Sequence, residues 1–308
     1  MRRALAGFIL LACTAAGLAG SAASATSGTS ATSGTSGGAA DADLWTEARM
    51  RHAREADDLG ALDVAARTAF APTAARLATP RPVARAASWT PTGTVARAVG
   101  RVFFTVGGRD YSCTGVAVVS ANRSTVITAG HCVHDGPGHY AGNWVFVPGY
   151  SAGRRPYGTW RARALGVPPG WARSGRLQDD VGFAVVAPLN GRRLTDVVGA
   201  VRVGFDRPRG AYVWAFGYPI AAPNGARRAL YCRGAVRKDR WGTGAQGLAC
   251  SMGQGASGGP WLADFSPARG TGTVYAVTSF TYRGMNGVVW APYLGRAGQV
   301  LYRAMQRR

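Results

Sequence analysis

Three short strings place the side chains needed for nucleophilic catalysis along one chain. Thr128 to Cys132 reads Thr-Ala-Gly-His-Cys and contains His131, Gln178 to Val186 places Asp180 before an apolar run, and Gly255 to Pro260 surrounds Ser257 with glycine. A serine hydroxyl becomes a nucleophile when a base with a pKa near neutrality takes its proton and a carboxylate orients that base. Glycines beside the serine let backbone N–H groups approach an oxyanion without a Cβ atom in the way. Together the strings predict hydrolysis of an acyl bond.

Other residues compete for these roles. Asp179 adjoins Asp180 and is an alternative carboxylate. His52, His134 and His139 are interpreted as exposed loop or helix residues rather than as bases. Ser257 alone fits an ordinary turn serine equally well, so the prediction depends on the three strings occurring together.

The composition indicates what kind of fold must position these residues. The chain has 308 residues, of which 47% are hydrophobic and 17% charged, and this excludes disorder throughout. With 44 glycines and 16 prolines it is rich in turns, which favours many short strands over a helical bundle.

From Val99 onward the sequence predicts eight or more short strands, each β-branched or aromatic and bounded by Gly, Pro, Asn or Asp. The predicted strands are 102–106, 115–119, 125–128, 144–147, 181–186, 212–216, 274–280 and 287–290. Their number and spacing favour a barrel or a sandwich. The segment 296–306 differs, because its apolar residues share one helical face, and it predicts a terminal helix docked on the β domain.

The first 97 residues have the features of a processed leader. Residues 1–25 combine two arginines, an apolar run and a small-residue cleavage site, which predicts a secretory signal peptide and no transmembrane segment. A lipoprotein signal acylated at Cys13 is the alternative. Residues 26–40 read as a flexible tether, 41–70 as one or two short helices, and the proline-rich stretch 72–91 as an exposed linker.

The charge is strongly positive and unevenly distributed. Lys and Arg total 36 against 15 Asp and Glu, a net charge of +21. Seven of the acidic residues lie between Asp41 and Asp63, and the part after Arg97 carries about +18. An acidic lead segment before a basic domain is typical of a removable propeptide. The positive charge is also compatible with an alternative function, in which the protein mainly binds polyanionic surfaces.

Four cysteines remain after Cys13, and in an oxidising compartment they predict two disulfides. Three pairings are possible, and clustering favours Cys113 with Cys132 and Cys232 with Cys250. Zinc is the competing interpretation, but the chain has no CxxC and its histidines lack the spacing of a zinc site.

The three strings, in the order His, Asp, Ser, resemble those of chymotrypsin-like serine endopeptidases over roughly residues 99–308. Within this family, the chain is similar to the secreted bacterial branch related to glutamyl endopeptidases in two segments, Trp144 to Tyr150 and Pro156 to Trp160. The resemblance implies an all-β fold of two six-stranded antiparallel barrels with the active site between them. The implied divisions are a signal peptide 1–25, a tether and propeptide 26–97, and a protease domain 98–308 with barrels at about 98–190 and 200–293 and a C-terminal helix at 294–308.

The resemblance also implies the role of each site residue. Ser257 is the nucleophile, His131 the base and Asp180 the residue that orients it, while Ser279 supports Asp180. The N–H groups of Gly255 and Ser257 form the oxyanion hole. The Cys113–Cys132 disulfide clamps the histidine loop.

The chain departs from the family at three positions that govern activation and specificity. Ala256 replaces the aspartate that receives a freed N-terminus in digestive members, Ser251 replaces the aspartate of trypsin-like specificity, and Thr278 replaces the histidine of the glutamyl branch. The implied pocket walls include Ser251, Phe280, Thr281 and Gly287, so substrate preference stays open.

These observations predict a secreted, monomeric serine endopeptidase made as a zymogen. The predicted binding partner of the enzyme is a protein or peptide substrate. No cofactor, metal or specific nucleic acid is expected. The alternative function is a protease-like binder or adhesin on polyanionic surfaces, and the alternative location is the cell surface, through a lipid at Cys13.

Overall fold

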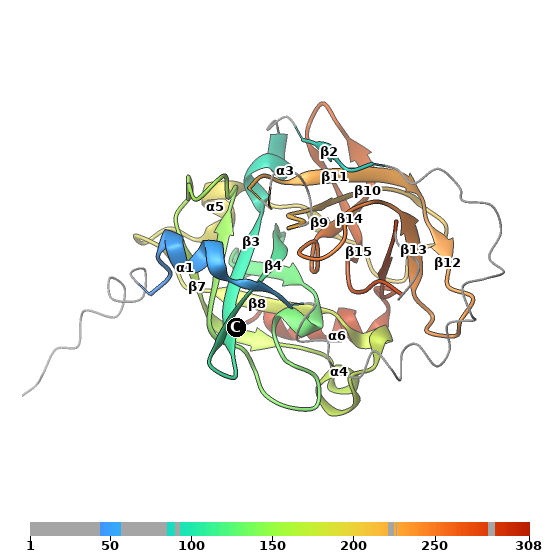
Figure 1. The fold of residues 1–308 in the computed structure, drawn as a ribbon, viewed down its shortest axis with the longest axis horizontal. Coiled ribbons are helices and arrows are strands. Elements are labelled where there is room, and N and C mark those ends of the chain that lie inside the picture. The colour runs from blue at the N-terminus through green and yellow to red at the C-terminus, as the bar shows by residue number, and fades with distance from the viewer. Residues whose placement is uncertain (1–43, 57–84, 90–92, 221–224, 226, 283–286) are drawn as a thin grey trace, which may run out of the picture. The chain divides into compact units, whose positions relative to one another are not determined.

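Six antiparallel strands close into a barrel in the first half of the fold (Figure 1). The strands are β3 (Val99–Val106), β4 (Arg109–Val118), β5 (Thr125–Thr128), β6 (Gly142–Pro148), β7 (Trp160–Gly166) and β8 (Gly182–Val186). They pair in the order β4-β3-β6-β7-β8-β5, and β5 pairs again with β4 to complete the circle. Phe104, Phe146 and Phe183 are fully buried in its core. The first predicted barrel is confirmed.

The computed structural model describes residues 44–56, 85–89, 93–220, 225, 227–282 and 287–308. The predicted signal peptide 1–25 with Cys13, the tether 26–40 and most of the predicted linker lie outside the described residues. The segment 44–56 contains α1 (Glu47–His52) and β1 (Arg54–Glu55), in agreement with a short helix in the predicted propeptide.

The second half is also a β structure, and its strands form two sheets. One sheet has the order β2 (Ala87–Ser88), β11 (Leu230–Ala235), β10 (Tyr212–Gly217), β14 (Pro260–Ser266), β15 (Thr271–Val277) and β9 (Arg202–Val203). The other has β12 (Arg237–Lys238), β13 (Gln246–Ala249) and β16 (Val288–Ala291). A bridge between Phe280 and Trp290 connects the end of β15 to β16. The predicted all-β, two-part fold is therefore confirmed, with the second barrel split into two sheets.

The described part of the proline-rich stretch is not a free linker. β2 pairs with β11, and Trp89 packs edge-on against Trp214, Phe216, Tyr231 and Phe265. α3 (Gly93–Ala98) follows and buries Val95 and Ala98. The partly buried Trp89 ring holds this segment against the second β half. Residues 85–89 are therefore a paired strand and not a free linker, although Arg85, Ala87 and Ser88 are exposed as expected.

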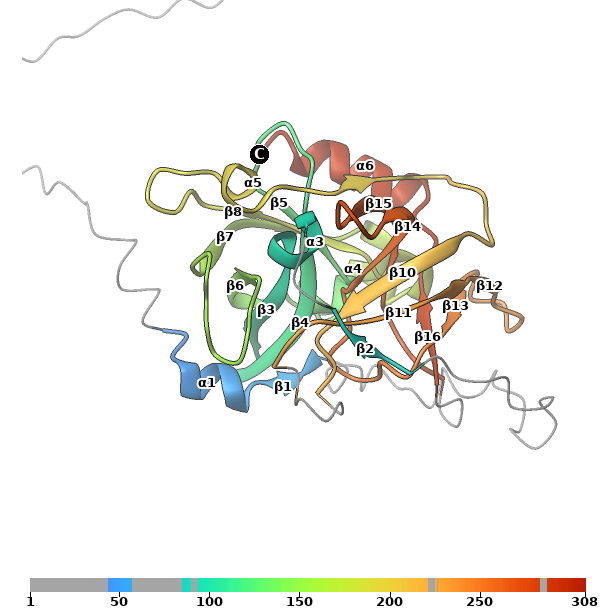
Figure 2. The ribbon, with the colours of Figure 1, turned by 90° about the horizontal axis from the view of Figure 1, so that it is seen from above.

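The remaining helices lie on the outside of the β structure. They are α4 (Pro169–Ser174), α5 (Leu194–Val198) and α6 (Arg296–Met305), with 3-10 turns at Gly130–Cys132 and Leu177–Asp179. α6, seen at the edge of the β structure in Figure 2, confirms the predicted terminal helix. It buries Met305 and packs Tyr302 against Phe183 and Phe205. In the described part of the chain, no helix is long and apolar enough to cross a membrane.

Disulfides join Cys113 to Cys132 and Cys232 to Cys250, as predicted. They close loops of 19 and 18 residues, so removing either by a double alanine substitution should lower the free energy of unfolding by about 3 kcal/mol. Urea denaturation measures this loss. Cys132 adjoins His131, so loss of the first disulfide should also lower kcat, whereas Cys250 adjoins Ser251 of the implied pocket, so loss of the second should mainly raise KM. Equal kcat values in the two double variants would contradict the role of the first disulfide.

Candidate active site

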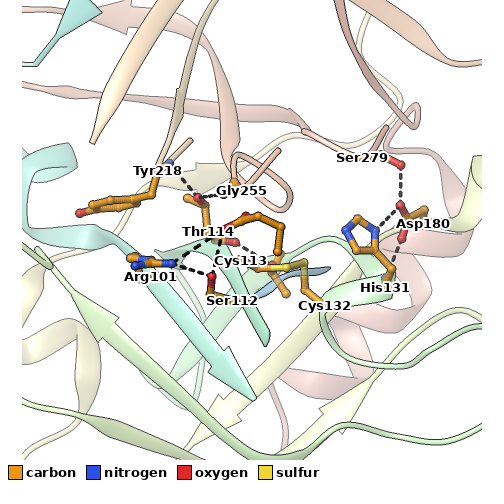
Figure 3. The surroundings of a disulfide bond; sticks show 12 residues. Arg101, Ser112, Cys113, Thr114, His131, Cys132, Asp180, Tyr218, Gly255 and Ser279 are labelled. Carbon is orange, nitrogen blue, oxygen red and sulfur yellow. Dashed lines mark hydrogen bonds and ion pairs between the residues drawn. A yellow bond between two sulfur atoms is a disulfide. The ribbon is translucent and has the colours of Figure 1, made fainter. Parts of the chain in front are cut away.

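His131 and Asp180 form a buried pair in the first barrel (Figure 3). Asp180 Oδ2 lies 2.9 Å from His131 Nδ1, and Asp180 Oδ1 accepts the His131 backbone N–H at 2.8 Å. Ser279, which follows β15 in the second half, donates its hydroxyl to Asp180 Oδ2. One carboxylate therefore holds both the ring and the backbone of the histidine and is itself held from the other half of the fold.

The Thr-Ala-Gly-His string folds so that this contact is possible. β5 ends at Thr128, and the chain turns into a 3-10 turn at Gly130–Cys132. A Cβ atom on Gly130 would lie 2.8 Å from Asp180 Oδ1 and 3.1 Å from the Trp171 ring, so a larger residue would push the carboxylate away. The Trp171 indole N–H donates to the His134 carbonyl at 2.8 Å and fixes the far side of the loop.

The surroundings of Asp180 favour its ionised form. Burial alone would raise the pKa of this carboxyl, but the charge interaction with His131 and the hydrogen bonds from His131 and Ser279 outweigh burial and hold the pKa below its ordinary value. An ionised carboxylate at Nδ1 keeps the proton on that nitrogen and leaves Nε2 as the basic atom.

Asp179 does not share this position. Its carboxylate accepts hydrogen bonds from the Arg176 guanidinium at 2.8 and 2.5 Å, within the turn at Leu177–Asp179. The structure therefore places Asp180 against His131, whereas the buried Asp179 forms an ion pair with Arg176.

The Ser257 loop lies between the two halves of the fold. The Thr114 backbone N–H on β4 donates to the Ser257 carbonyl at 2.7 Å, and the Thr114 hydroxyl donates to the Gly255 carbonyl at 3.1 Å. A Cβ atom on Gly258 would lie 2.0 Å from Thr128 Oγ1 and 2.9 Å from the Ala129 nitrogen. Gly258 also has a positive φ of 79°. Glycine is required here because the serine loop packs directly against the loop that carries His131.

The predicted pocket residues come together through β16. Its pairing with β13 and the Phe280–Trp290 bridge bring Ser251, Phe280 and Gly287 into one region, and Cys250 donates its N–H to the Gly287 carbonyl at 2.8 Å. Ser251 and Thr281 are exposed, whereas Phe280 is buried against Tyr282 and Trp290. The Ser251 hydroxyl accepts the Ala86 N–H at 2.8 Å.

The three other histidines lie away from the pair. His52 and His139 are exposed, as expected. His134 corrects the expectation, because it is buried edge-on against Tyr140, and this burial lowers its pKa.

Cys113, His131 and Cys132 form the one group of possible metal ligands found among the described residues. The two sulfur atoms are bonded to each other, so they offer no thiolate to a metal ion. Their arrangement instead fixes β4 to the histidine loop.

Sequence reasoning missed the residue that joins these parts. Thr114 holds the Ser257 loop, receives the Tyr218 N–H on its hydroxyl at 3.0 Å, and accepts the Thr128 hydroxyl on its carbonyl at 2.8 Å. Its position directly after Cys113 is the only signal in the sequence, and it is a weak one.

Two β halves that meet at a histidine–carboxylate pair and a glycine-flanked serine define a two-barrel serine hydrolase. The fold is similar to that of the protease Anisep from Arthrobacter nicotinovorans, with 41% identity, a TM-score of 0.67, and coverage of 72% of this chain and 99% of that one. It is also similar to the serine protease AL20 from an extremophilic microorganism, with 36% identity, a TM-score of 0.66, and coverage of 70% and 99%. This chain belongs to the chymotrypsin-like serine protease family.

Curated relatives match over a shorter stretch. A glutamyl endopeptidase of Bacillus licheniformis is 39% identical over 72 residues, or 23% of this chain, and a protein named extracellular metalloprotease of Bacillus subtilis is 36% identical over 72 residues. The match spans about a fifth of the length of each relative, 22% in both cases. No family model matches the chain.

Proposed function

We propose that this chain is a secreted serine endopeptidase, made as a precursor, that hydrolyses peptide bonds through Ser257, His131 and Asp180. The observation that carries the proposal is the Asp180 carboxylate held on His131 Nδ1 beside the Ser257 loop. Membership of the serine protease family supports the same reaction.

The proposed reaction has two stages. Ser257 Oγ attacks the scissile carbonyl while His131 Nε2 takes its proton and passes it to the leaving amine, giving an acyl-enzyme. Water then attacks the acyl carbon, gives its proton to His131, and releases the acid as Ser257 recovers its proton. Asp180 stays ionised and stabilises the imidazolium, and the N–H groups of Gly255 and Ser257 stabilise the oxyanion.

The segment 44–56 is proposed to cover the site until it is removed. Trp45 is fully buried and donates its indole N–H to the Asn143 carbonyl at 2.8 Å, and Arg49 pairs with Asp110 at 2.5 Å. A Cβ atom on Gly255 would lie 2.3 Å from Glu55 Oε2, so Glu55 touches the proposed oxyanion loop. Residues 86–89 and 93–98 pack into the β structure, and we therefore move the proposed start of the protease domain from 98 to about 86.

The alternative function, binding to polyanionic surfaces, is supported by a surface hollow lined by Arg97, Arg154 and Arg155. An export signal at 1–25, with a lipid at Cys13 as the alternative anchor, remains part of the proposal.

A fluorophosphonate probe tests the proposed function, because it reacts covalently only with an activated serine. Processed protein should incorporate one label per chain, and peptide mapping should locate it at Ser257. Unprocessed precursor should label much more slowly if residues 44–56 cover the site. Heat-denatured protein is the control. Absence of labelling in folded, processed protein would rule out the enzyme and favour the polyanion binder.

A further inference from the structure

A buried arginine lies outside the catalytic residues, on the β4 side of the Ser257 loop. Arg101 extends from β3, and its guanidinium lies 4.7 Å from the centre of the Phe103 ring and 5.3 Å from that of Tyr150. Only 6% of its side chain is exposed. Aromatic faces stabilise a cation in part, but a buried charge also requires a counter-charge.

Glu55 supplies that counter-charge in the precursor. Arg101 donates to the Ser112 hydroxyl at 2.6 Å, and this hydroxyl donates to Glu55 Oε1 at 3.3 Å. Arg101 and Glu55 are 4.0 Å apart, and within the described ranges no other carboxylate forms an ion pair with Arg101. Ser112 therefore connects the cation to the carboxylate.

Glu55 reaches this position as part of an added strand. β1 pairs in parallel with β4, with Arg54 opposite Tyr111 and Glu55 opposite Ser112. Strand addition to a sheet edge is a common way for proteins to hold a peptide, with side-chain pockets providing selectivity. The edge segment Tyr111–Ser112 belongs to the protease domain and stays in place when the leader is removed.

The pocket lies on a defined side of the proposed active site. Ser112 directly precedes Cys113, and the Cys113–Cys132 disulfide separates Arg101 and Ser112 from the group of His131, Asp180 and Ser279 (Figure 3). The proposed specificity pocket adjoins Ser279, so it lies on the far side of the Ser257 loop. A peptide that places the residue before its scissile bond in that pocket would extend the residues after the scissile bond, the leaving-group side, past Gly255 toward Arg101.

We propose that Arg101 and Ser112 form a subsite for an acidic side chain of the polypeptide substrate, on the leaving-group side of the scissile bond, and that Glu55 fills it in the precursor. This inference rests on the proposed endopeptidase function. Departure of residues 44–56 leaves Arg101 without its carboxylate while Phe103, Tyr150 and Ser112 still hold it. A glutamate or aspartate from the substrate restores the ion pair, whereas glutamine restores only hydrogen bonds.

Paired quenched fluorescent peptides test the subsite. Each pair differs only by Glu or Gln at one of the first four positions after the scissile bond, and the enzyme is processed protein shown by mass spectrometry to lack residues 44–56. At one position the Glu peptide should have a kcat/KM about tenfold higher, as expected for a charged hydrogen-bonded pair. This ratio should fall to about one in Arg101→Met. Arg123→Met, which removes a surface arginine paired with Asp196, is the matched control and should keep the ratio.

A binding measurement separates this inference from the proposed function. A labelled peptide with the sequence of residues 44–56 should bind processed Ser257→Ala protein about tenfold more tightly than its Glu55→Gln version. Equal affinities, or Glu to Gln ratios of one at all four positions in an enzyme that cleaves the peptides, would overturn the subsite. A clear affinity difference with no cleavage of any peptide would refute the endopeptidase, and with it a substrate subsite, and would leave Arg101 and Ser112 as a binding site for Glu55 alone.

Discussion

The Ser257→Ala protein should hydrolyse peptides about 10⁶-fold more slowly than the wild type, because the substitution removes the atom that forms the acyl-enzyme. The residual rate would come from substrate binding and the oxyanion hole, which do not need the hydroxyl. The Ser257 backbone contact to Thr114 does not involve the side chain, so the variant should fold normally. The measurement is kcat on one peptide, with enzyme processed by an added protease.

Ser266→Ala is the matched control, because Ser266 ends β14, the strand that follows the Ser257 loop. It should retain wild-type kcat. A Ser257→Ala protein that keeps more than about 1% of the wild-type rate would show that another group is the nucleophile.

Asp180→Asn should lower kcat by about 10⁴-fold while leaving the loop folded. The amide N–H₂ can donate to His131 Nδ1 and so favour the tautomer with the proton on Nε2, which cannot accept a proton from Ser257. The neighbouring Asp179→Asn is the matched control, because Asp179 contacts Arg176 and not His131. Similar losses in the two variants would contradict the assignment of Asp180.

The pH dependence of stability gives a second readout of Asp180. Because the folded protein lowers the pKa of this carboxyl, its ionised form stabilises the fold at pH values above the unfolded pKa of about 3.9. This contribution is lost as the pH falls through the lower, folded pKa. The wild type should therefore lose unfolding free energy as the pH falls below about 4, and Asp180→Asn, which has no carboxyl to protonate at this position, should lose less over the same range. Equal losses of unfolding free energy in the two proteins below pH 4 would argue that Asp180 is not held ionised.

The strands that the sequence predicted have uninterrupted β-branched or aromatic runs. β3, β5 and β8 are buried along most of their length, so a local run of Val, Ile and Phe is enough to identify them. β7 alternates with arginine, and β11 carries a cysteine, an arginine and a glycine, so neither shows such a run. Their strand structure depends on partners far along the chain, which local propensity does not report.

The sequence by itself predicted the fold class, favoured the disulfide pairing that the structure has, and selected His131, Ser257 and an adjacent pair of aspartates, because each catalytic candidate lies in a short string of characteristic chemistry. Tertiary structure decided which of two adjacent aspartates faces the histidine, since Asp179 and Asp180 differ only in the partners that a turn presents to them. It also brought Glu55 to Arg101 and Thr114 to Ser257, contacts between residues that are distant in sequence. Such contacts follow from how strands pair and close into barrels. Strand pairing is set by the burial of whole faces rather than by any local motif.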